Sequence, residues 1–150
     1  MKHLTATATR RVAAPIDDAY ALLVDIDGYP RWYPAGVASA AVTARDSNEV
    51  PTAARASLNG RLGPINRTFD LNLSVSVQRP ESVELSRIAH DAGDSERFVV
   101  RWRLRPEEGG TRIAVEFDAL LSIPPLVPVG GIADTIAAGF ADAAAQALES

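Results

Sequence analysis

Alternating hydrophobic and polar positions dominate the chain and predict an antiparallel β-sheet. The clearest run is FDLNLSVSVQ at 69–78, where Phe, Leu and Val alternate with Asp, Asn, Ser and Gln. A period of two is typical of strands that bury one face. The pattern predicts further strands at 3–12, 37–46, 50–62, 82–89, 97–105 and 111–121. Short breaks containing Pro, Gly and Asp separate the later strands, so consecutive strands should pair as hairpins.

Two segments have a helical period instead. Residues 16–26 carry an apolar stripe after Pro15, which suits the first position of a helix. Residues 132–150 are rich in alanine and form a second, narrower stripe that includes Ile136 and Phe140. The connector DIDGYPRWYP at 25–34 is broken by two prolines, so only a short helical turn fits there.

This element order predicts an α+β fold. One apolar sheet face must be covered, and the C-terminal helix is the largest element that can cover it. Because part of that helix carries only small side chains, it need not fill the space above a curved sheet. The 150 residues show no internal linker or repeat, so a single domain spanning 1–150 with an internal cavity is expected.

Composition narrows the classes of function. The net charge of −4 and the pI near 5.1 argue against a nucleic-acid partner, which favours a basic face. The chain has no cysteine, which excludes thiolate chemistry. We see no apolar run resembling a signal sequence or a membrane span, so a cytoplasmic protein without integral membrane contact is expected.

Familiar catalytic patterns are weak. His3 and His90 lack ligand-like spacing, so no metal site is predicted. His90-Asp91 could form a base with its orienting carboxylate, but a solvated histidine beside a loop is the simpler interpretation. The glycine pairs lie at turns, so no nucleotide or other cofactor is expected. Alternating arginines at 101–105 and the acidic residues Glu116 and Asp118 predict an outer sheet face with cross-strand ion pairs.

Two stretches resemble a known family. APIDDAYALLVDIDGYPRWYP, and RWRLRPEEGGTRIAVEFDALLSIP followed by a terminal helix, are similar to the START-like (SRPBCC) superfamily, in particular its polyketide cyclase/dehydrase and coenzyme Q-binding branches. The resemblance implies the helix-grip fold, in which a seven-stranded curved antiparallel sheet wraps around a long C-terminal helix. One helix and a short helix would lie between the first two strands. It also implies a pocket for a hydrophobic ligand, and such pockets measure roughly 300–1,000 Å³.

The aromatic and aliphatic residues on the inward face are the candidate ligand-binding set. Tyr29 and Tyr33 are expected at the pocket mouth, because tyrosine keeps its hydroxyl hydrated while burying its ring. Trp32 is either a gate residue or ordinary core. The expected lining residues are Phe69, Leu71, Leu73, Trp102, Phe117, Ile136 and Phe140.

The resemblance leaves three functions open. The first is binding or carriage of a hydrophobic or amphipathic small molecule, such as a polyketide, isoprenoid, quinone or lipid-like compound. The second is a polyketide cyclase or dehydratase, whose relatives place a basic residue and a hydroxyl in the pocket from the fourth strand. The third is a partner-binding module related to a toxin that acts on ribosomes.

Departures from the cyclase pattern favour binding. The fourth strand offers Asn72, Ser74 and Ser76 but no arginine, and Gly36 stands where a pocket tyrosine is expected. Arginines 55, 61 and 67 are alternative sources of the basic group, and their directions stay open. Ligand identity, turnover and oligomeric state likewise stay open at this point.

Overall fold

In the part of the chain that the computed structural model describes, residues 1–62 and 65–149, seven strands form one antiparallel sheet in the order β1-β7-β6-β5-β4-β3-β2. Side chains are described for residues 1–60 and 66–149. The strands are β1 (Lys2–Val12), β2 (Val37–Arg45), β3 (Pro51–Leu62), β4 (Ile65–Gln78), β5 (Ser82–Arg87), β6 (Arg97–Glu107) and β7 (Gly110–Leu121). β1 and β2 stand at the two ends of this order, so they are the edges of the sheet, and the first strand pairs with the last.

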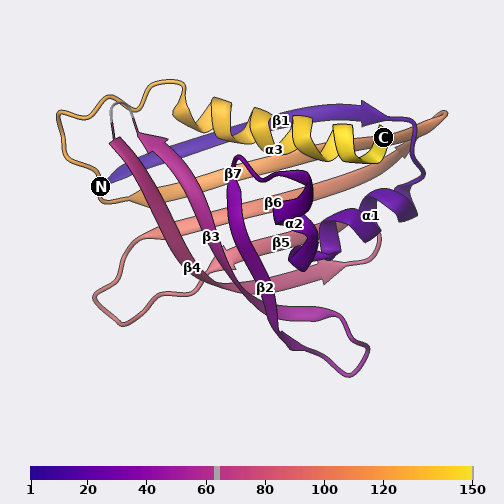
Figure 1. The fold of residues 1–150 in the computed structure, drawn as a ribbon, viewed down its shortest axis with the longest axis horizontal. Coiled ribbons are helices and arrows are strands. Elements are labelled where there is room, and N and C mark those ends of the chain that lie inside the picture. The colour runs from indigo at the N-terminus through magenta and orange to yellow at the C-terminus, as the bar shows by residue number, and fades with distance from the viewer. Residues whose placement is uncertain (63–64, 150) are drawn as a thin grey trace.

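The helices lie where the sequence pattern predicts them. Between β1 and β2 the chain forms α1 (Ile16–Val24), the 3₁₀ turn η1 (Ile26–Gly28) and the short helix α2 (Tyr29–Trp32). The long helix α3 (Ile132–Glu149) closes the chain and runs along β1 and β7, while β2, β3 and β4 cross the direction of the other strands (Figure 1). The predicted helix-grip architecture is therefore confirmed. No helix among the described residues is long and apolar enough to cross a membrane.

Small side chains let α3 lie close to the sheet. Ala137, Ala141 and Ala144 are buried on the face of α3 that packs against the sheet. On the sheet, Trp102, Ile113 and Val115 are fully buried on the concave face. The opposite face carries the predicted cross-strand ion pairs, which include Arg101 with Glu84 and Glu116, Arg103 with Glu116, and Arg97 with Asp118.

Some strand boundaries differ from the prediction. β4 begins at Ile65 rather than at residue 69, because the polar residues 66–68 pair with β3 although they do not alternate. β6 continues through Pro106 to Glu107, where it forms a tight turn into β7. β5 ends at Arg87, two residues before the predicted end at residue 89. The first helix ends at Val24, since Asp25 leaves the helical conformation.

Two irregularities interrupt the sheet. β4 pairs with β5 only from Leu73 onward, so residues 65–72 of β4 extend beyond that ladder and, apart from a bond from the Ile88 N–H to the Asn72 carbonyl oxygen, pair with β3. The edge strand β2 pairs with β3 through three register shifts, between Val37 and Arg45. Within β2, the backbone N–H of Val42 donates to Asp27 Oδ1 at 2.7 Å instead of to another strand.

Candidate functional site

Two small apolar cavities lie between α3 and the concave face of the sheet. The first measures about 50 Å³ and the second about 30 Å³. The first is lined by Tyr33, Gly36, Leu58, Asn59, Gly60, Phe69, Phe98, Phe117, Leu121, Ile136 and Phe140. The second is lined by Ile26, Tyr29, Val37, Ala40, Ala56, Leu58, Leu73, Leu85, Phe98, Val100 and Phe140. Leu58, Phe98 and Phe140 line both cavities, so these three side chains form the partition between them.

The cavities are far smaller than the predicted pocket. The prediction rested on the small residues of α3, but aromatic side chains fill the space that those residues leave. The Phe98 and Phe117 rings meet edge to face with centroids 5.3 Å apart, and Tyr33 meets Phe140 in the same way at 4.9 Å. This geometry is the favoured one for aromatic pairs. The expectation of a large preformed hollow is therefore wrong.

Tyr33 occupies a space that two glycines leave open. A Cβ atom at Gly36 would overlap the Tyr33 ring and lie 2.9 Å from its hydroxyl oxygen. A Cβ atom at Gly139 of α3 would overlap the same hydroxyl. The tyrosine expected from the resemblance at position 36 is thus replaced by the ring of Tyr33. Its hydroxyl makes no hydrogen bond within the described chain, and burial raises its pKa.

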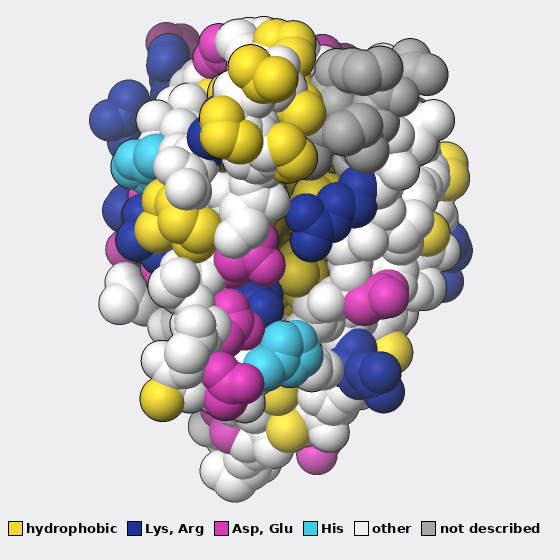
Figure 2. Space-filling model, turned by 90° about the vertical axis from the view of Figure 1, so that its left-hand side faces the viewer, with side chains coloured by type: hydrophobic (Ala, Val, Ile, Leu, Met, Phe, Trp, Pro, Cys, Tyr) yellow, Lys and Arg dark blue, Asp and Glu magenta, His cyan; other side chains and the backbone are white. Residues whose placement is uncertain are grey.

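Phe69 lines the first cavity, and Arg67 lies over its ring. Phe69 is half-buried against Gly60, and the exposed Arg67 guanidinium lies over its ring, 4.5 Å from the centroid. Such a cation–π contact at an exposed site contributes about 0.5–1 kcal/mol. Figure 2 shows the end of the molecule at the left of Figure 1, where hydrophobic surface lies at the bottom of a hollow rimmed by basic, acidic and histidine side chains.

Tyr29 does not lie at the mouth, and that prediction is wrong. Its side chain is 4% exposed, and its hydroxyl donates to the Leu23 carbonyl oxygen at 2.6 Å. Burial raises the pKa of Tyr29 far above its usual value, which the nearby Trp102 indole offsets only in part. That indole is not placed for a well-formed hydrogen bond, and Nε1 of both Trp102 and Trp32 is buried without a partner in the described chain. Tyr29 therefore ties α2 to α1.

The predicted lining residues separate into three groups. Tyr33, Phe69, Phe117, Ile136 and Phe140 line the first cavity, and Tyr29, Leu73 and Phe140 line the second. Trp32, Leu71 and Trp102 line neither cavity; Leu71 and Trp102 are buried in the core, and the half-buried Trp32 packs against it. Leu58 and Phe98 line both cavities but are not among the lining residues predicted from the sequence. Leu58 lies two residues after the buried Ala56, and Phe98 lies two residues before the buried Val100. Because side chains two residues apart in a strand lie on the same face, this spacing in the sequence could have identified both.

The structure shows the side-chain directions of two of the three arginines, Arg55 and Arg67, that the sequence left open. Arg55 is exposed between the buried Ala54 and Ala56, so its side chain lies on the outer face. Arg67 shares the parity of Phe69 and lies over the ring of that cavity-lining residue, but it does not itself line the first cavity. The side chain of Arg61 lies outside the described residues. The fourth-strand polar residues Asn72, Ser74 and Ser76 are exposed on the outer face and do not reach the cavities.

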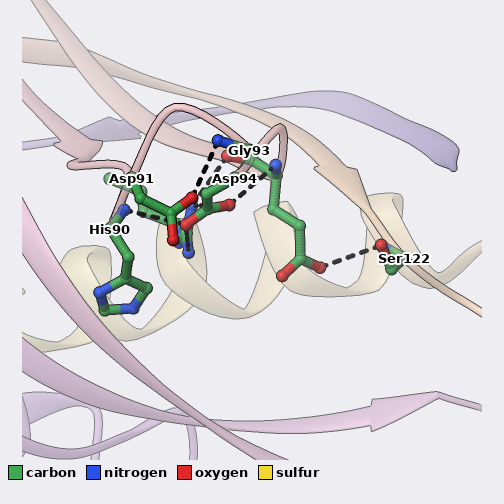
Figure 3. A network of polar contacts seen from close by, with 7 residues as sticks. His90, Asp91, Gly93, Asp94 and Ser122 are labelled. Atoms are coloured by element: carbon green, nitrogen blue, oxygen red, sulfur yellow. Dashed lines mark hydrogen bonds and ion pairs between the residues drawn. The ribbon is translucent and has the colours of Figure 1, made fainter.

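A partly buried ion pair organises the loop between β5 and β6. Arg87 binds Asp94 through two contacts, Nη1 to Oδ1 at 3.0 Å and Nη2 to Oδ2 at 2.6 Å. The same carboxylate accepts the backbone N–H groups of His90 and Glu96. Glu96 in turn accepts the Ser122 N–H, which connects the loop to the end of β7 (Figure 3).

The contacts in this loop distinguish the two interpretations of His90, a catalytic base or a solvated side chain. The Asp91 carboxylate accepts the Gly93 N–H, and the His90 ring points away from both aspartates (Figure 3). The ring makes no hydrogen bond with the described chain, so the solvated histidine is the correct interpretation. The described residues also contain no group of three or more His, Asp or Glu that could hold a metal ion.

The loop is expected to loosen in acid. Hydrogen bonds from Arg87 hold the pKa of Asp94 well below its ordinary value of 3.8. Because the folded pKa is depressed, the stabilisation is fully present above pH 3.8 and is lost as the pH falls toward the folded pKa. We predict that Asp94→Asn speeds amide exchange at His90 and Glu96 at least about tenfold near pH 6, since charge-assisted hydrogen bonds are lost.

Asp91→Asn is the matched control, because it removes the same charge from the same loop. It should leave those two amides protected near pH 6, and hydrogen exchange followed by NMR measures both variants. Equal exchange in the two variants would show that the Asp94 carboxylate does not hold the loop.

Solved structures with the same fold have low sequence identity to this chain. A START superfamily protein from Mycobacterium smegmatis aligns with a TM-score of 0.77 at 18% identity, covering 98% of this chain and 97% of that one. The Zhui aromatase/cyclase from Streptomyces sp. R1128 aligns with a TM-score of 0.71 at 13% identity, covering 98% and 94%. Major latex-like protein 151 from Panax ginseng aligns with a TM-score of 0.69 at 8% identity, covering 97% of both chains.

These likenesses establish the fold and nothing finer. No curated protein matches the sequence. A family model does, and it covers residues 12–145, from the end of β1 almost to the end of α3. This span includes both cavities and all the residues that line them. The chain therefore belongs to the family described as polyketide cyclase / dehydrase and lipid transport.

Proposed function

We propose that the protein binds a hydrophobic or amphipathic small molecule between α3 and the sheet, and that Tyr33 must move to admit it. The observation that carries this proposal is the position of Tyr33, whose ring lies over Gly36 and Gly139. Two glycines at facing positions keep the space around the ring clear of other side chains. With no hydrogen bond to hold the hydroxyl, only packing keeps the ring in place.

The chamber for the ligand is the two cavities taken together. Rotation of Phe98 or Phe140 would join them, because these side chains form the partition together with Leu58. The gain on binding is burial of apolar ligand surface, about 25 cal/mol for each Å² removed from water before the costs of association. Arg67, which lies over the Phe69 ring, suits the polar end of an amphipathic ligand.

Binding is favoured over turnover by the chemistry of the lining. A cyclase moves protons, which needs an acid or base with a pKa near the working pH. Among the side chains that line the two cavities, the titratable ones are Tyr29 and Tyr33. Burial raises the pKa of both hydroxyls, so they are poor proton donors and are not available as bases. We therefore propose carriage or sequestration rather than catalysis.

The neutral probe N-phenyl-1-naphthylamine tests the proposal. Tyr33→Ala should bind it about tenfold more tightly than the unaltered protein, since about 60 Å² of additional apolar contact corresponds to about 1.5 kcal/mol. Probe fluorescence and quenching of the nearby Trp32 report binding, because Trp32 and Tyr33 have ring centroids 6.3 Å apart.

Two further variants control this experiment. Tyr33→Phe keeps the ring and should bind like the unaltered protein. Ile136→Trp adds bulk to the first cavity from a half-buried position and should weaken binding. Absence of saturable binding in Tyr33→Ala would refute the proposal, as would binding that Ile136→Trp leaves unchanged.

A further inference from the structure

The outer face of the sheet carries three arginines in one row across three strands. Arg11 of β1 lies directly opposite Arg112 of β7, and Arg112 lies directly opposite Arg105 of β6. All three are exposed, because the buried residues beside them face α3. Like charges directly opposite each other destabilise a sheet. Glu107 pairs with both Arg11 and Arg112 and offsets their repulsion, whereas the Arg105 side chain has no carboxylate partner in the described chain, so its charge is the one that the fold leaves uncompensated.

An open depression of about 560 Å³ lies beside the row. Its charged walls are Arg103, Arg105 and Arg112, and Glu81 is the one carboxylate that lines it among the described residues. In the neighbouring row Ala114 lies opposite Arg103, and its small side chain leaves the space between the arginines unfilled. Neutral polar groups complete the lining, namely Thr9, Gln78 and Ser82.

The arginines keep donors available for a ligand. Arg112 donates to Glu107 through Nε, and Arg103 donates to Glu116 through Nε. Neither ion pair engages the terminal Nη groups. The Arg105 side chain makes no hydrogen bond or ion pair with any residue in the described part of the chain. The depression thus combines three guanidinium groups, one carboxylate and several hydroxyl or amide donors.

We propose that this depression binds a phosphate-bearing small molecule. A guanidinium presents its N–H groups in a planar fork that matches phosphate oxygens, and each such bond is charge-assisted. Hydroxyl and amide groups supply the neutral donors that phosphate also accepts. An anion between Arg105 and Arg112 would offset the like-charge repulsion of the row. The site lies on the face of the sheet opposite α3, so it does not depend on the proposed apolar ligand.

Titration with pyrophosphate at low ionic strength, followed by calorimetry, tests this site, because surface charges are least screened there. Saturable binding is expected, and Arg105→Gln should weaken it at least about tenfold, since hydrogen bonds to charged groups contribute strongly. The Arg105 side chain has no hydrogen-bond or ion-pair partner in the described chain, so its replacement should leave the fold intact. Glu81→Gln should tighten binding, because it removes the one carboxylate that lines the depression.

Arg97→Gln is the matched control. Arg97 lies on the same strand and the same face, is exposed, and pairs with Asp118 away from the depression. It should bind pyrophosphate like the unaltered protein. Equal weakening by Arg97→Gln and Arg105→Gln would mean that net charge alone attracts the anion, and the site would be refuted. It would also be refuted if pyrophosphate gave no saturable heat, or if an acidic peptide bound through Arg105 where pyrophosphate did not.

Discussion

Replacing Trp102 by alanine is expected to lower the free energy of unfolding by about 3–5 kcal/mol. The side chain is 0% exposed at the centre of β6. Its ring meets Phe140 of α3 and Trp32 of α2, with centroids 6.1 and 6.3 Å away, so it joins three elements. Native domains are stable by about 5–15 kcal/mol, so this loss is a large fraction of the total. Urea denaturation followed by far-ultraviolet circular dichroism measures it.

Trp102→Phe separates packing from hydrogen bonding. It keeps an aromatic ring and removes the indole N–H, which has no partner in the described chain. Because phenylalanine is smaller than tryptophan, we expect a loss of about 1–3 kcal/mol from the reduced packing, less than that of Trp102→Ala. A loss as large as that of Trp102→Ala would mean that the indole N–H makes a bond that matters to the fold, which would contradict our account of this residue.

Replacing Gly110 by alanine is expected to cost about 3 kcal/mol, at the upper end of the range for overpacking. Gly110 starts β7 directly after the turn from β6. A Cβ atom there would overlap the Val12 carbonyl oxygen and lie 3.0 Å from the Cα of Ala13. These neighbours are backbone atoms, so a change of side-chain rotamer cannot relieve the overlap. The strand pairing of β1 with β7 must shift instead.

Gly130→Ala is the control for this prediction. No atom lies within 4 Å of a Cβ built at Gly130, which is exposed in the segment before α3. Its free energy of unfolding should change by no more than about 0.5 kcal/mol. Thermal and urea unfolding of the two variants compare the same substitution at a crowded and an open site. Equal stabilities would contradict the close approach of β7 to the residues after β1.

The sequence predicts the fold well where the hydrophobic period is regular. The run at 69–78 alternates without exception and the run at 97–105 does so apart from Val99, and both are strands with the expected inward face. Strand boundaries are predicted less accurately where a strand is held by backbone hydrogen bonds to its neighbour and buries no apolar side chains. Residues 66–68 of β4 are exposed on both faces and lack the periodic signal, although they pair with β3.

The site is harder to predict than the fold, because it depends on side-chain conformation. Strand parity places Phe117 on an inward face and the helical period does the same for Phe140, and both line a cavity. It does not determine whether their rings leave a large space or fill it. The burial of Tyr29 is missed for a similar reason, since its hydroxyl finds the Leu23 carbonyl of the preceding helix. Contacts of that kind depend on three-dimensional approach.

The irregular pairing of β2 has a consequence for the solution behaviour of the protein. An edge strand with a straight, unoccupied row of N–H and C=O groups can recruit a strand from another molecule. Here three register shifts bend β2, and a carboxylate from η1 occupies one of its amides. This margin of the sheet is therefore a poor template for intermolecular strand addition, and filament growth along it is disfavoured.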